Sequence, residues 1–246
     1  MVLRALELVP ELLRLPPWVP VDGAHAYGHL VWVRIEGPPP PEVRSALHSD
    51  EWAVTARFAD RRVATWAAGR LALRAALRAC DRPTHGPLLA DDRGAPCAPP
   101  GVRVSISHTD DLAVALVAPG TAGHVGVDLE RVAPPRLEIE SIVMTPREVS
   151  AIAHLTDEQR WRALLLRFSV KEALYKVLDP SLRRWIDFHE VEIDASVHHP
   201  EAGASVPVTF ARLPAALGAL GESSIVASCA AGAGHVLSTA IRDRTS

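Results

Sequence analysis

The stretch His124-Val-Gly-Val-Asp-Leu-Glu130 decides the fold, because hydrophobic and acidic residues alternate along it. Such alternation is typical of a β-strand, whose successive side chains point to opposite faces of a sheet. Val125 and Val127 then share one face, and Asp128 and Glu130 lie side by side on the other. Two adjacent carboxylates repel each other, so they indicate either a solvated strand end or a site for a hard cation such as Mg²⁺.

A long helix is predicted further along the chain. The segment Thr156-Asp-Glu-Gln159 has the residues of a capping box, and Pro180 should end the helix that it opens. The i,i+4 spacing places Phe168, Glu172 and Lys176 on one face of this helix. An exposed Glu–Lys pair is the simpler interpretation. The alternative is a third carboxylate and an ammonium group that together bind a metal-bound diphosphate.

Lysine is rare in this chain, which favours the second interpretation. Of 26 basic residues only two are lysines, and both Lys171 and Lys176 fall in this helix. Coding bias alone could explain two surviving lysines. At a tight site, however, a guanidinium group cannot replace an ammonium group. The more specific hypothesis is therefore that function requires a lysine at these two positions.

The remaining elements favour an α+β fold. Helices and strands do not alternate strictly, as they would in a doubly wound sheet. A seam at Pro119-Gly120 predicts two lobes, residues 1–119 and 120–246, each with an early helix and a hairpin-like strand pair. The expected helices are 49–78, one from 145 and 156–179, and the expected strands are 29–35, 102–106, 112–117, 124–130, 188–193, 206–211, 224–229 and 236–241.

Composition excludes several classes of protein. The net charge of −3 provides no global basic field, so nucleic acid is not an expected partner. Three widely spaced cysteines and no apolar run of membrane-spanning length predict a cytoplasmic protein without membrane contact. The N-terminus lacks the pattern of a signal peptide. The histidines lack the paired spacing of a zinc site.

Two further groups could bind phosphate. Ser107 and His108 end a predicted strand and can donate hydrogen bonds to a phosphate, although for the pair alone a structural turn is the favoured interpretation. Adjacent strand residues point to opposite faces, so His108 is badly placed as a base for a Ser107 nucleophile. The i,i+4 ladder of Arg70, Arg74 and Arg78 makes a basic stripe that is either a solvated helix face or a phosphate-binding surface.

In their order along the chain, these motifs resemble those of the 4′-phosphopantetheinyl transferases of the surfactin-synthetase-activating type. The main pair is G-V-D-L-E at 126–130 and F-S-V-K-E-A-L-Y-K at 168–176. Three supporting segments precede it, A-G-R-L-A-L-R-A-A-L at 68–77, D-R-G-A-P at 92–96 and S-I-S-H-T at 105–109. Phe168, where many members have Trp, points to the enterobactin-type branch. Ala90 replaces a basic residue of some relatives.

The resemblance implies an α+β fold of two similar lobes related by pseudo-twofold symmetry, with coenzyme A in the cleft between them. Asp128, Glu130 and Glu172 correspond to the family's magnesium ligands, for which manganese is an alternative metal. Glu172 is also the candidate base for the incoming serine. The other implied residues are Lys176 at the diphosphate, Ser107 and His108 at phosphates, Arg62 and Arg70 at the outer phosphate or nucleotide, Arg93 near the nucleotide, and Lys171 as a further cofactor contact.

The implied activity is that of a holo-[acyl-carrier-protein] synthase, which moves phosphopantetheine from coenzyme A to an apo acyl or peptidyl carrier protein. Because the partner supplies the nucleophilic serine, no nucleophile–base pair is needed in this chain. We expect a monomer, with a carrier-docking surface formed by residues 136–165. Two rivals stay open at this point, a magnesium-dependent hydrolase of a phosphate compound and a module that binds carriers or coenzyme A without turnover.

Overall fold

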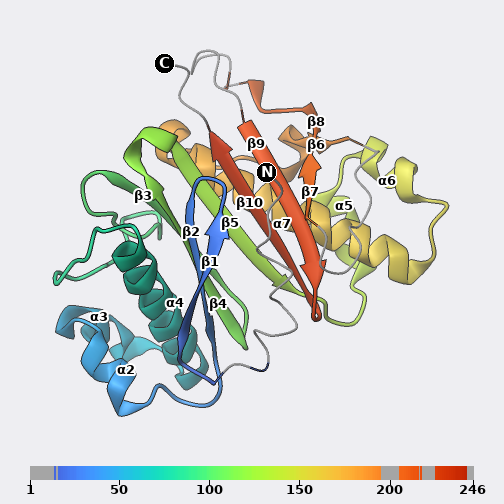
Figure 1. Ribbon diagram of the computed structural model, residues 1–246. Coiled ribbons are helices and arrows are strands. Elements are labelled where there is room, and N and C mark those ends of the chain that lie inside the picture. Colours follow the sequence, from blue (N-terminus) through green and yellow to red (C-terminus); the bar gives the residue numbers. More distant parts are fainter. Residues whose placement is uncertain (1–13, 15, 195–204, 216, 218–224, 243–246) are drawn as a thin grey trace.

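The computed structural model describes residues 14, 16–194, 205–215, 217 and 225–242 of the chain. It contains two four-stranded antiparallel sheets, each accompanied by one long helix (Figure 1). The strand orders are β1-β2-β4-β3 and β5-β10-β9-β7, and a small third sheet pairs β6 with β8. Separate helices and antiparallel sheets confirm the predicted α+β class.

The first sheet is covered on one face by helix α4, Asp60–Ala79. Alanines and leucines of α4 pack against alternate residues of the sheet, among them Val31, Val33 and Ala115. The elements before the seam are β1 Pro20–His25, β2 Gly28–Arg34, α2 Pro41–Ala46, α3 Ser49–Val54, the 3-10 turn η1 Thr55–Arg57, α4, β3 Val102–His108 and β4 Leu112–Pro119.

The second sheet packs against helix α7, Asp157–Leu182. Although α7 is the longest helix, no helix among the described residues is long and apolar enough to cross a membrane. The other elements after the seam are η2 Gly120–Ala122, β5 His124–Arg131, η3 Leu137–Ile139, α5 Glu140–Val143, α6 Pro146–Ile152, η4 Phe188–Glu190, β6 Glu192–Ile193, β7 Ser205–Val208, β8 Phe210–Arg212, β9 Ile225–Gly232 and β10 His235–Arg242.

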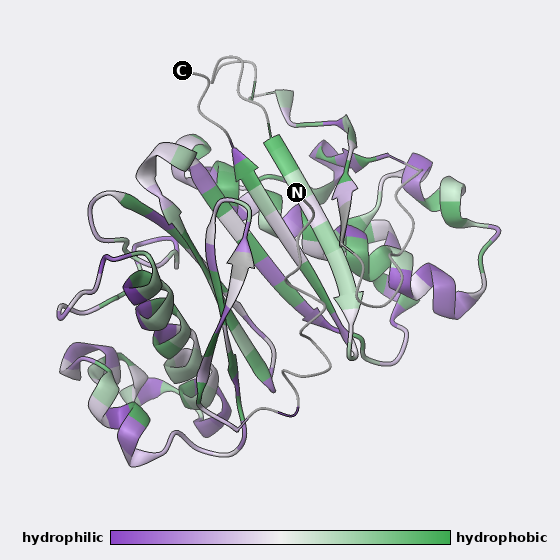
Figure 2. Ribbon diagram, in the orientation of Figure 1, coloured by the Kyte–Doolittle hydropathy of each residue, from purple (hydrophilic) through white to green (hydrophobic). Residues whose placement is uncertain are grey.

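The two sheets face each other, and the interface between them is a hydrophobic core of its own. Trp32, Val114 and Leu116 of the first sheet meet residues such as Val127 and Leu129 of β5 there. Figure 2 shows hydrophobic residues concentrated on these facing strands. Burying one face of β5 in this core leaves its other face, with Asp128 and Glu130, toward α7, as the alternation predicts.

The division into lobes 1–119 and 120–246 stays a prediction, as does the pseudo-twofold relation between them. Strands β1 to β4 all precede the seam and β5 to β10 all follow it. Each sheet carries one long helix on the face that points away from the other sheet. This arrangement is what two similar lobes would produce.

Several element boundaries differ from the sequence-based expectation. The predicted helix 49–78 is broken by η1 and an extended residue at Phe58. The predicted strand 188–193 begins as η4, because Asp187 caps a short turn there. Helix α7 continues past Pro180 to Leu182 and ends where Arg183 adopts a left-handed conformation. Strand β1 has no hydrophobic alternation and was not predicted.

His25, at the end of β1, is a buried histidine that ties the first sheet to the second. Its Nδ1 accepts a hydrogen bond from the backbone N–H of Tyr27 at 3.3 Å, so Nε2 carries the proton and donates to Thr239 Oγ1 at 3.2 Å. Burial lowers the pKa of His25 from 6.5 to about 4. The folded protein therefore holds this imidazole neutral at pH values where the unfolded chain protonates it.

We expect this histidine to make the protein less stable in mild acid. Between pH 6.5 and 4 the unfolded chain binds the extra proton, so the free energy of unfolding should fall as the pH falls, by about 2–4 kcal/mol over the window. Urea unfolding at pH 7 and pH 4.5 measures this slope. His25→Gln should make the slope shallower and leave the part that comes from His108, whose pKa is also lowered to about 4, whereas a Gln at the exposed His154 should leave the slope unchanged. Equal slopes in wild type and His25→Gln would refute the assignment.

Candidate active site

Strand β5 and helix α7 approach unusually closely at Gly126. A Cβ atom on Gly126 would lie 2.0 Å from the carbonyl oxygen of Ala173, which is closer than any real contact. Glycine is therefore required here for close backbone approach. The approach brings the outward face of β5, with Asp128 and Glu130, against the face of α7 that carries Glu172.

Gly126→Ala should disrupt this approach. Overpacking typically costs about 1–3 kcal/mol, and here the clash is with backbone, so we expect the upper part of that range together with a loss of activity. Gly86→Ala is the matched control, because its added methyl would meet its nearest neighbour at an ordinary 3.7 Å. Thermal unfolding of both variants tests the prediction, and wild-type stability of Gly126→Ala would contradict it.

Asp128 is the most buried of the site carboxylates, with 4% of its surface exposed. Its Oδ1 accepts hydrogen bonds from Ser107 Oγ at 3.1 Å and from Lys176 Nζ at 2.8 Å. Lys176 also donates to the carbonyl oxygen of Val127 at 2.9 Å. The Oδ2 atom is buried and has no hydrogen-bond partner among the described residues. One oxygen thus positions Lys176, and the other is left for a ligand.

Glu130 and Glu172 lie in surroundings that disfavour their charged forms. Burial, and then the negative charges of Asp128 and Glu172, raise the pKa of Glu130 to about 7, against a lowering effect of Lys176. Burial and the charge of Asp128 also raise the pKa of Glu172. The three carboxylates are therefore close enough to repel one another, and a bound cation would relieve that repulsion.

The donor set fits a hard divalent cation that takes part of its coordination from elsewhere. Among the described residues no group of three or more His, Cys, Asp or Glu side chains is arranged so that it could hold a metal ion by itself, and Asp128, Glu130 and Glu172 are no exception. Mg²⁺ commonly binds one or two carboxylates and keeps water and phosphate oxygens as its other ligands. The unpartnered Asp128 Oδ2 and the two carboxylates with raised pKa values, Glu130 and Glu172, match that requirement.

Lys171 lines a small pocket next to Glu172, but its ammonium group is already bound to other parts of the protein, contrary to the sequence-based prediction of a cofactor contact. Only 2% of its surface is exposed, and Nζ donates to Glu148 Oε2 at 2.7 Å, to the carbonyl of Val143 at 2.8 Å and to that of Phe188 at 3.1 Å. An ammonium group has three N–H donors, and all three are used. Lys171 is a structural residue that joins α7 to α6 and to the segments before α6 and after α7.

Arg62 and His108 come together from α4 and β3. Arg62 Nη1 donates to His108 Nε2 at 2.9 Å. Burial, and then the positive charges of Arg62 and Lys176, lower the pKa of His108 to about 4, so the ring is neutral at physiological pH. Ser107 donates to the same Asp128 oxygen as Lys176, so this end of β3 lies beside Lys176.

The predicted arginine ladder is split between two roles. Arg74 is buried in an ion pair with Glu51 at 2.9 Å, so it holds α3 against α4 and cannot form a phosphate-binding stripe. Arg70 is 5% exposed and stacks on the Trp66 ring, 3.9 Å from its centroid. Its Nε has no partner among the described residues, and burial lowers its pKa to about 10. Arg70 therefore keeps donors available for an anion, and Arg74 does not.

Arg93 lies at the rim of the site but is already held by α7. Its Nε donates to both carboxylate oxygens of Asp179 at 2.8 Å, and Nη2 donates to Tyr175 Oη at 3.0 Å. These bonds attach the loop around residue 93 to the helix that carries Glu172. Its predicted contact to a nucleotide would use the side of the guanidinium that faces the pocket, and that contact stays a prediction.

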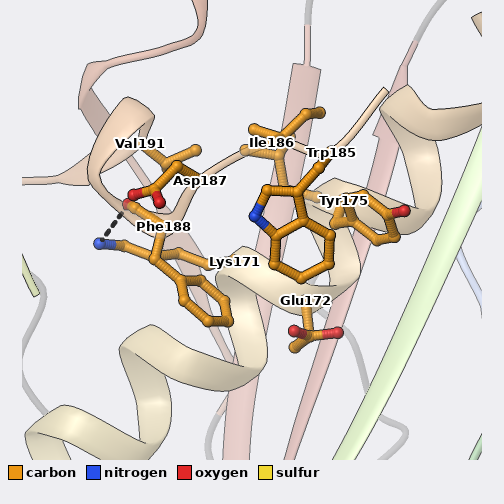
Figure 3. A pocket seen from close by; sticks show the side chains of 9 residues that line it. Lys171, Glu172, Tyr175, Trp185, Ile186, Asp187, Phe188 and Val191 are labelled. Carbon is orange, nitrogen blue, oxygen red and sulfur yellow. Dashed lines mark hydrogen bonds between the residues drawn. The ribbon is translucent and has the colours of Figure 1, made fainter. Parts of the chain in front are cut away.

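Two pockets meet at Glu172. The larger, here called the main pocket, has a volume of about 470 Å³, and its walls include Arg93, Ser105, Tyr175, Lys176 and Asp179. The smaller, called the aromatic pocket, lies on the other side of Glu172. Figure 3 shows Trp185 between Tyr175 and Phe188, with Glu172 beside them. Trp185 is 63% exposed.

Sequence reasoning missed the aromatic pocket. Tyr175 and Asp179 follow Glu172 at i+3 and i+7, so the helical face that includes Glu172 could have been extended to them. Trp185 and Phe188 follow the end of α7 in irregular chain, where no periodicity marks a residue as part of a site. Only the turn of the chain after Arg183 brings their rings over the helix.

Comparison with known proteins identifies the family of this chain. A family model for the 4′-phosphopantetheinyl transferase superfamily matches residues 124–211, and one for the 4′-phosphopantetheinyl transferase N-terminal domain matches residues 50–118. The 4′-phosphopantetheinyl transferase Svp of Streptomyces mobaraensis is 33% identical over 168 residues. The match covers 67% of this chain and 66% of Svp, just under two thirds of that relative's length.

Solved structures provide two more distant similarities. The Bacillus anthracis holo-(acyl-carrier-protein) synthase in complex with CoA is 13% identical, with 50% of this chain and 97% of that chain covered and a TM-score of 0.38. Holo-ACP-synthase from Plasmodium yoelii is 15% identical, with 51% and 97% covered and a TM-score of 0.38. On the two family models and the match to Svp, this chain belongs to the 4′-phosphopantetheinyl transferase superfamily.

Proposed function

We propose that this protein transfers the 4′-phosphopantetheine group of coenzyme A to a serine of an apo acyl or peptidyl carrier protein. The observation that carries the proposal is the position of Glu172, which lies between the two pockets and next to Lys176 and Asp128. A family assignment alone would not distinguish an active enzyme from a binding module. An intact set of carboxylates around an ammonium group favours the enzyme.

The reaction is a substitution at phosphorus. The carrier serine oxygen forms a bond to the phosphorus that bears the pantetheine arm, and the bond from that phosphorus to the bridging oxygen breaks. 3′,5′-ADP leaves with the bridging oxygen, and the serine proton passes to Glu172, directly or through a water. Glu172 lines both pockets, so its carboxylate can reach a serine on one side and the diphosphate on the other.

Lys176 is the residue we place at the diphosphate. It lines the main pocket, and its ammonium group is held in place by Asp128 and by the carbonyl of Val127. A fixed compact charge next to the breaking bond stabilises negative charge as it develops there. Ser107 and His108 stand beside it as phosphate contacts, and Arg62 and Arg70 are placed further along, toward the outer phosphate.

A divalent cation, Mg²⁺ or its substitute Mn²⁺, would be held by Asp128, Glu130 and Glu172. The chemistry supplied by a cation in this position is neutralisation of the diphosphate charge. Its binding would also lower the pKa values that burial and mutual repulsion raise in Glu130 and Glu172. The main pocket is assigned to the nucleotide, with Arg93 at its rim.

The uncharged pantetheine arm and the acceptor serine are placed on the other side of Glu172. The aromatic pocket there has a volume of only about 10 Å³, room for about one water molecule, so the arm would lie across the rings of Tyr175, Trp185 and Phe188 and not inside the pocket. A carrier docked over the exposed Trp185 would present its serine to Glu172. This placement uses residues of α7 and of the segment after it, and the docking surface predicted from sequence, residues 136–165, stays a separate prediction.

Mass spectrometry of the carrier tests the proposed function. Incubation with coenzyme A, Mg²⁺ and an apo carrier should increase the carrier's mass by one phosphopantetheine group. Release of phosphopantetheine or phosphate without any carrier would support the hydrolase instead. Carrier binding without any mass gain, across fatty acid, polyketide and peptide carriers, would support the non-catalytic module. We also propose that the protein works as a cytoplasmic monomer, which light scattering and cell fractionation can check.

A further inference from the structure

A third pocket adjoins the main pocket and is not used by the proposed reaction. It has a volume of about 210 Å³, and we call it the basic pocket; it is lined by Arg103, Gly123, His124, Ser181 and Arg242. Arg103 and His124 also line the main pocket, so the two pockets share a wall.

The basic pocket lies away from the reacting groups. On β5, His124 precedes Asp128 by four residues, which is about 13 Å along an extended strand. On α7, Ser181 follows Glu172 by nine residues, which is also about 13 Å along a helix. On β3, Arg103 is near the opposite end from Ser107. The three elements therefore agree that this pocket lies about 13 Å, between two and three turns of a helix, beyond Asp128 and Glu172.

Among the residues that the structure describes, the lining of the basic pocket includes two arginines and no carboxylate. Two guanidinium groups, an imidazole and a hydroxyl line it. Arg242 Nη1 donates to Ser181 Oγ at 2.9 Å, which holds both side chains at the wall. Within the part of the chain that the structure describes, Arg103 has no ion pair, and its buried Nε has no hydrogen-bond acceptor. A buried donor without an acceptor costs free energy that a bound anion would recover.

The chemistry of the pocket selects the class of ligand. Guanidinium groups bind tetrahedral and carboxylate oxyanions with two parallel hydrogen bonds, and such charge-assisted bonds are the strong ones. The volume accommodates several water molecules, which suits a small oxyanion and not a second nucleotide. We propose that the basic pocket binds a small phosphate-type oxyanion, at a site separate from the phosphates of coenzyme A.

Titration with inorganic phosphate at constant ionic strength tests this proposal directly. Calorimetry or ³¹P NMR should show saturable binding of one phosphate to the wild-type protein. Arg103→Gln and Arg242→Gln should each weaken that binding by roughly 10-fold to 100-fold, as expected for loss of a charge-assisted hydrogen bond. Arg162→Gln, which removes an exposed arginine that pairs with Glu158 on α7, is the matched control and should bind phosphate like wild type.

Competition with 3′,5′-ADP separates the two sources of phosphate. Phosphate binding that persists with saturating 3′,5′-ADP supports a separate site. Phosphate that is displaced by 3′,5′-ADP belongs to the nucleotide site and overturns the proposal. Absence of saturable binding, or unchanged binding in both arginine variants, overturns it as well. If Arg103→Gln fails to fold, Arg242→Gln combined with Ser181→Ala answers the same question, and none of these measurements depends on transfer activity.

Discussion

Glu172→Gln is expected to reduce the rate of phosphopantetheine transfer by about 10³-fold, the effect typical for loss of a general base or of a metal-bound carboxylate. The amide keeps the shape of the side chain but cannot accept the serine proton. The folded protein should lose no stability. Since burial and Asp128 raise the pKa of Glu172, its charge is unfavourable in the folded state, and a neutral residue removes that cost. Carrier mass gain over time and urea unfolding measure the two effects.

Glu158→Gln is the matched control, because Glu158 lies on the same helix in an exposed pair with Arg162. We expect wild-type transfer from it. A variant Glu172→Gln that transfers at the wild-type rate would show that Glu172 is neither the base nor a metal ligand. A variant could also be slow because it is unfolded. The urea unfolding curve, recorded on the same sample, shows whether Glu172→Gln is folded.

The largest effect on stability is expected from Glu148→Ala. The Glu148 carboxylate is almost fully buried and accepts hydrogen bonds from Lys171 Nζ at 2.7 Å, from the backbone N–H of Thr145 at 2.8 Å and from that of Ile193 at 2.9 Å. Arg167 is buried beside it, 3.9 Å away. Without Glu148 two buried cations lose their compensating charge, which typically costs about 3–5 kcal/mol.

The free energy of unfolding of a typical protein is about 5–15 kcal/mol, so this loss is a large part of it. Glu148→Ala should therefore unfold at a much lower urea concentration than wild type, or fail to fold. Glu158→Ala, at an exposed ion pair, should change stability by no more than about 1 kcal/mol. The double variant Glu148→Leu with Lys171→Met should recover part of the loss, since it removes both members of the buried pair. Equal stability of Glu148→Ala and Glu158→Ala would contradict the structural role.

The same experiment separates the two lysines of the chain. Lys171→Met should lower stability and leave the KM for coenzyme A unchanged in the folded fraction. Lys176→Met should raise the KM for coenzyme A and change stability little, because Lys176 lines the main pocket and is partly exposed there. If Lys171→Met is fully stable but binds coenzyme A weakly, Lys171 contacts the cofactor after all and its structural role is refuted.

Local patterns in the sequence determined most of the fold and the centre of the site. Alternation along 124–130 fixes which side chains share a face, since neighbouring strand residues must point in opposite directions. Helical spacing places Glu172 and Lys176 together, because residues four positions apart lie on the same face of a helix. The capping boxes at Thr145 and Thr156 locate helix starts because they satisfy backbone donors within three residues. None of these inferences needs a partner far away in the sequence.

Tertiary structure alone decided how each charge is used. Lys171 and Lys176 are five residues apart, which is about 140° around a helix, so they face different surroundings that no local pattern describes. Glu148 neutralises Lys171 from 23 positions away, and Glu51 neutralises Arg74 across the same separation. A charged group is free for a ligand only where no such partner reaches it. Asp128, buried with one oxygen unpaired and Lys176 on the other, is in that position because β5 and α7 meet at Gly126.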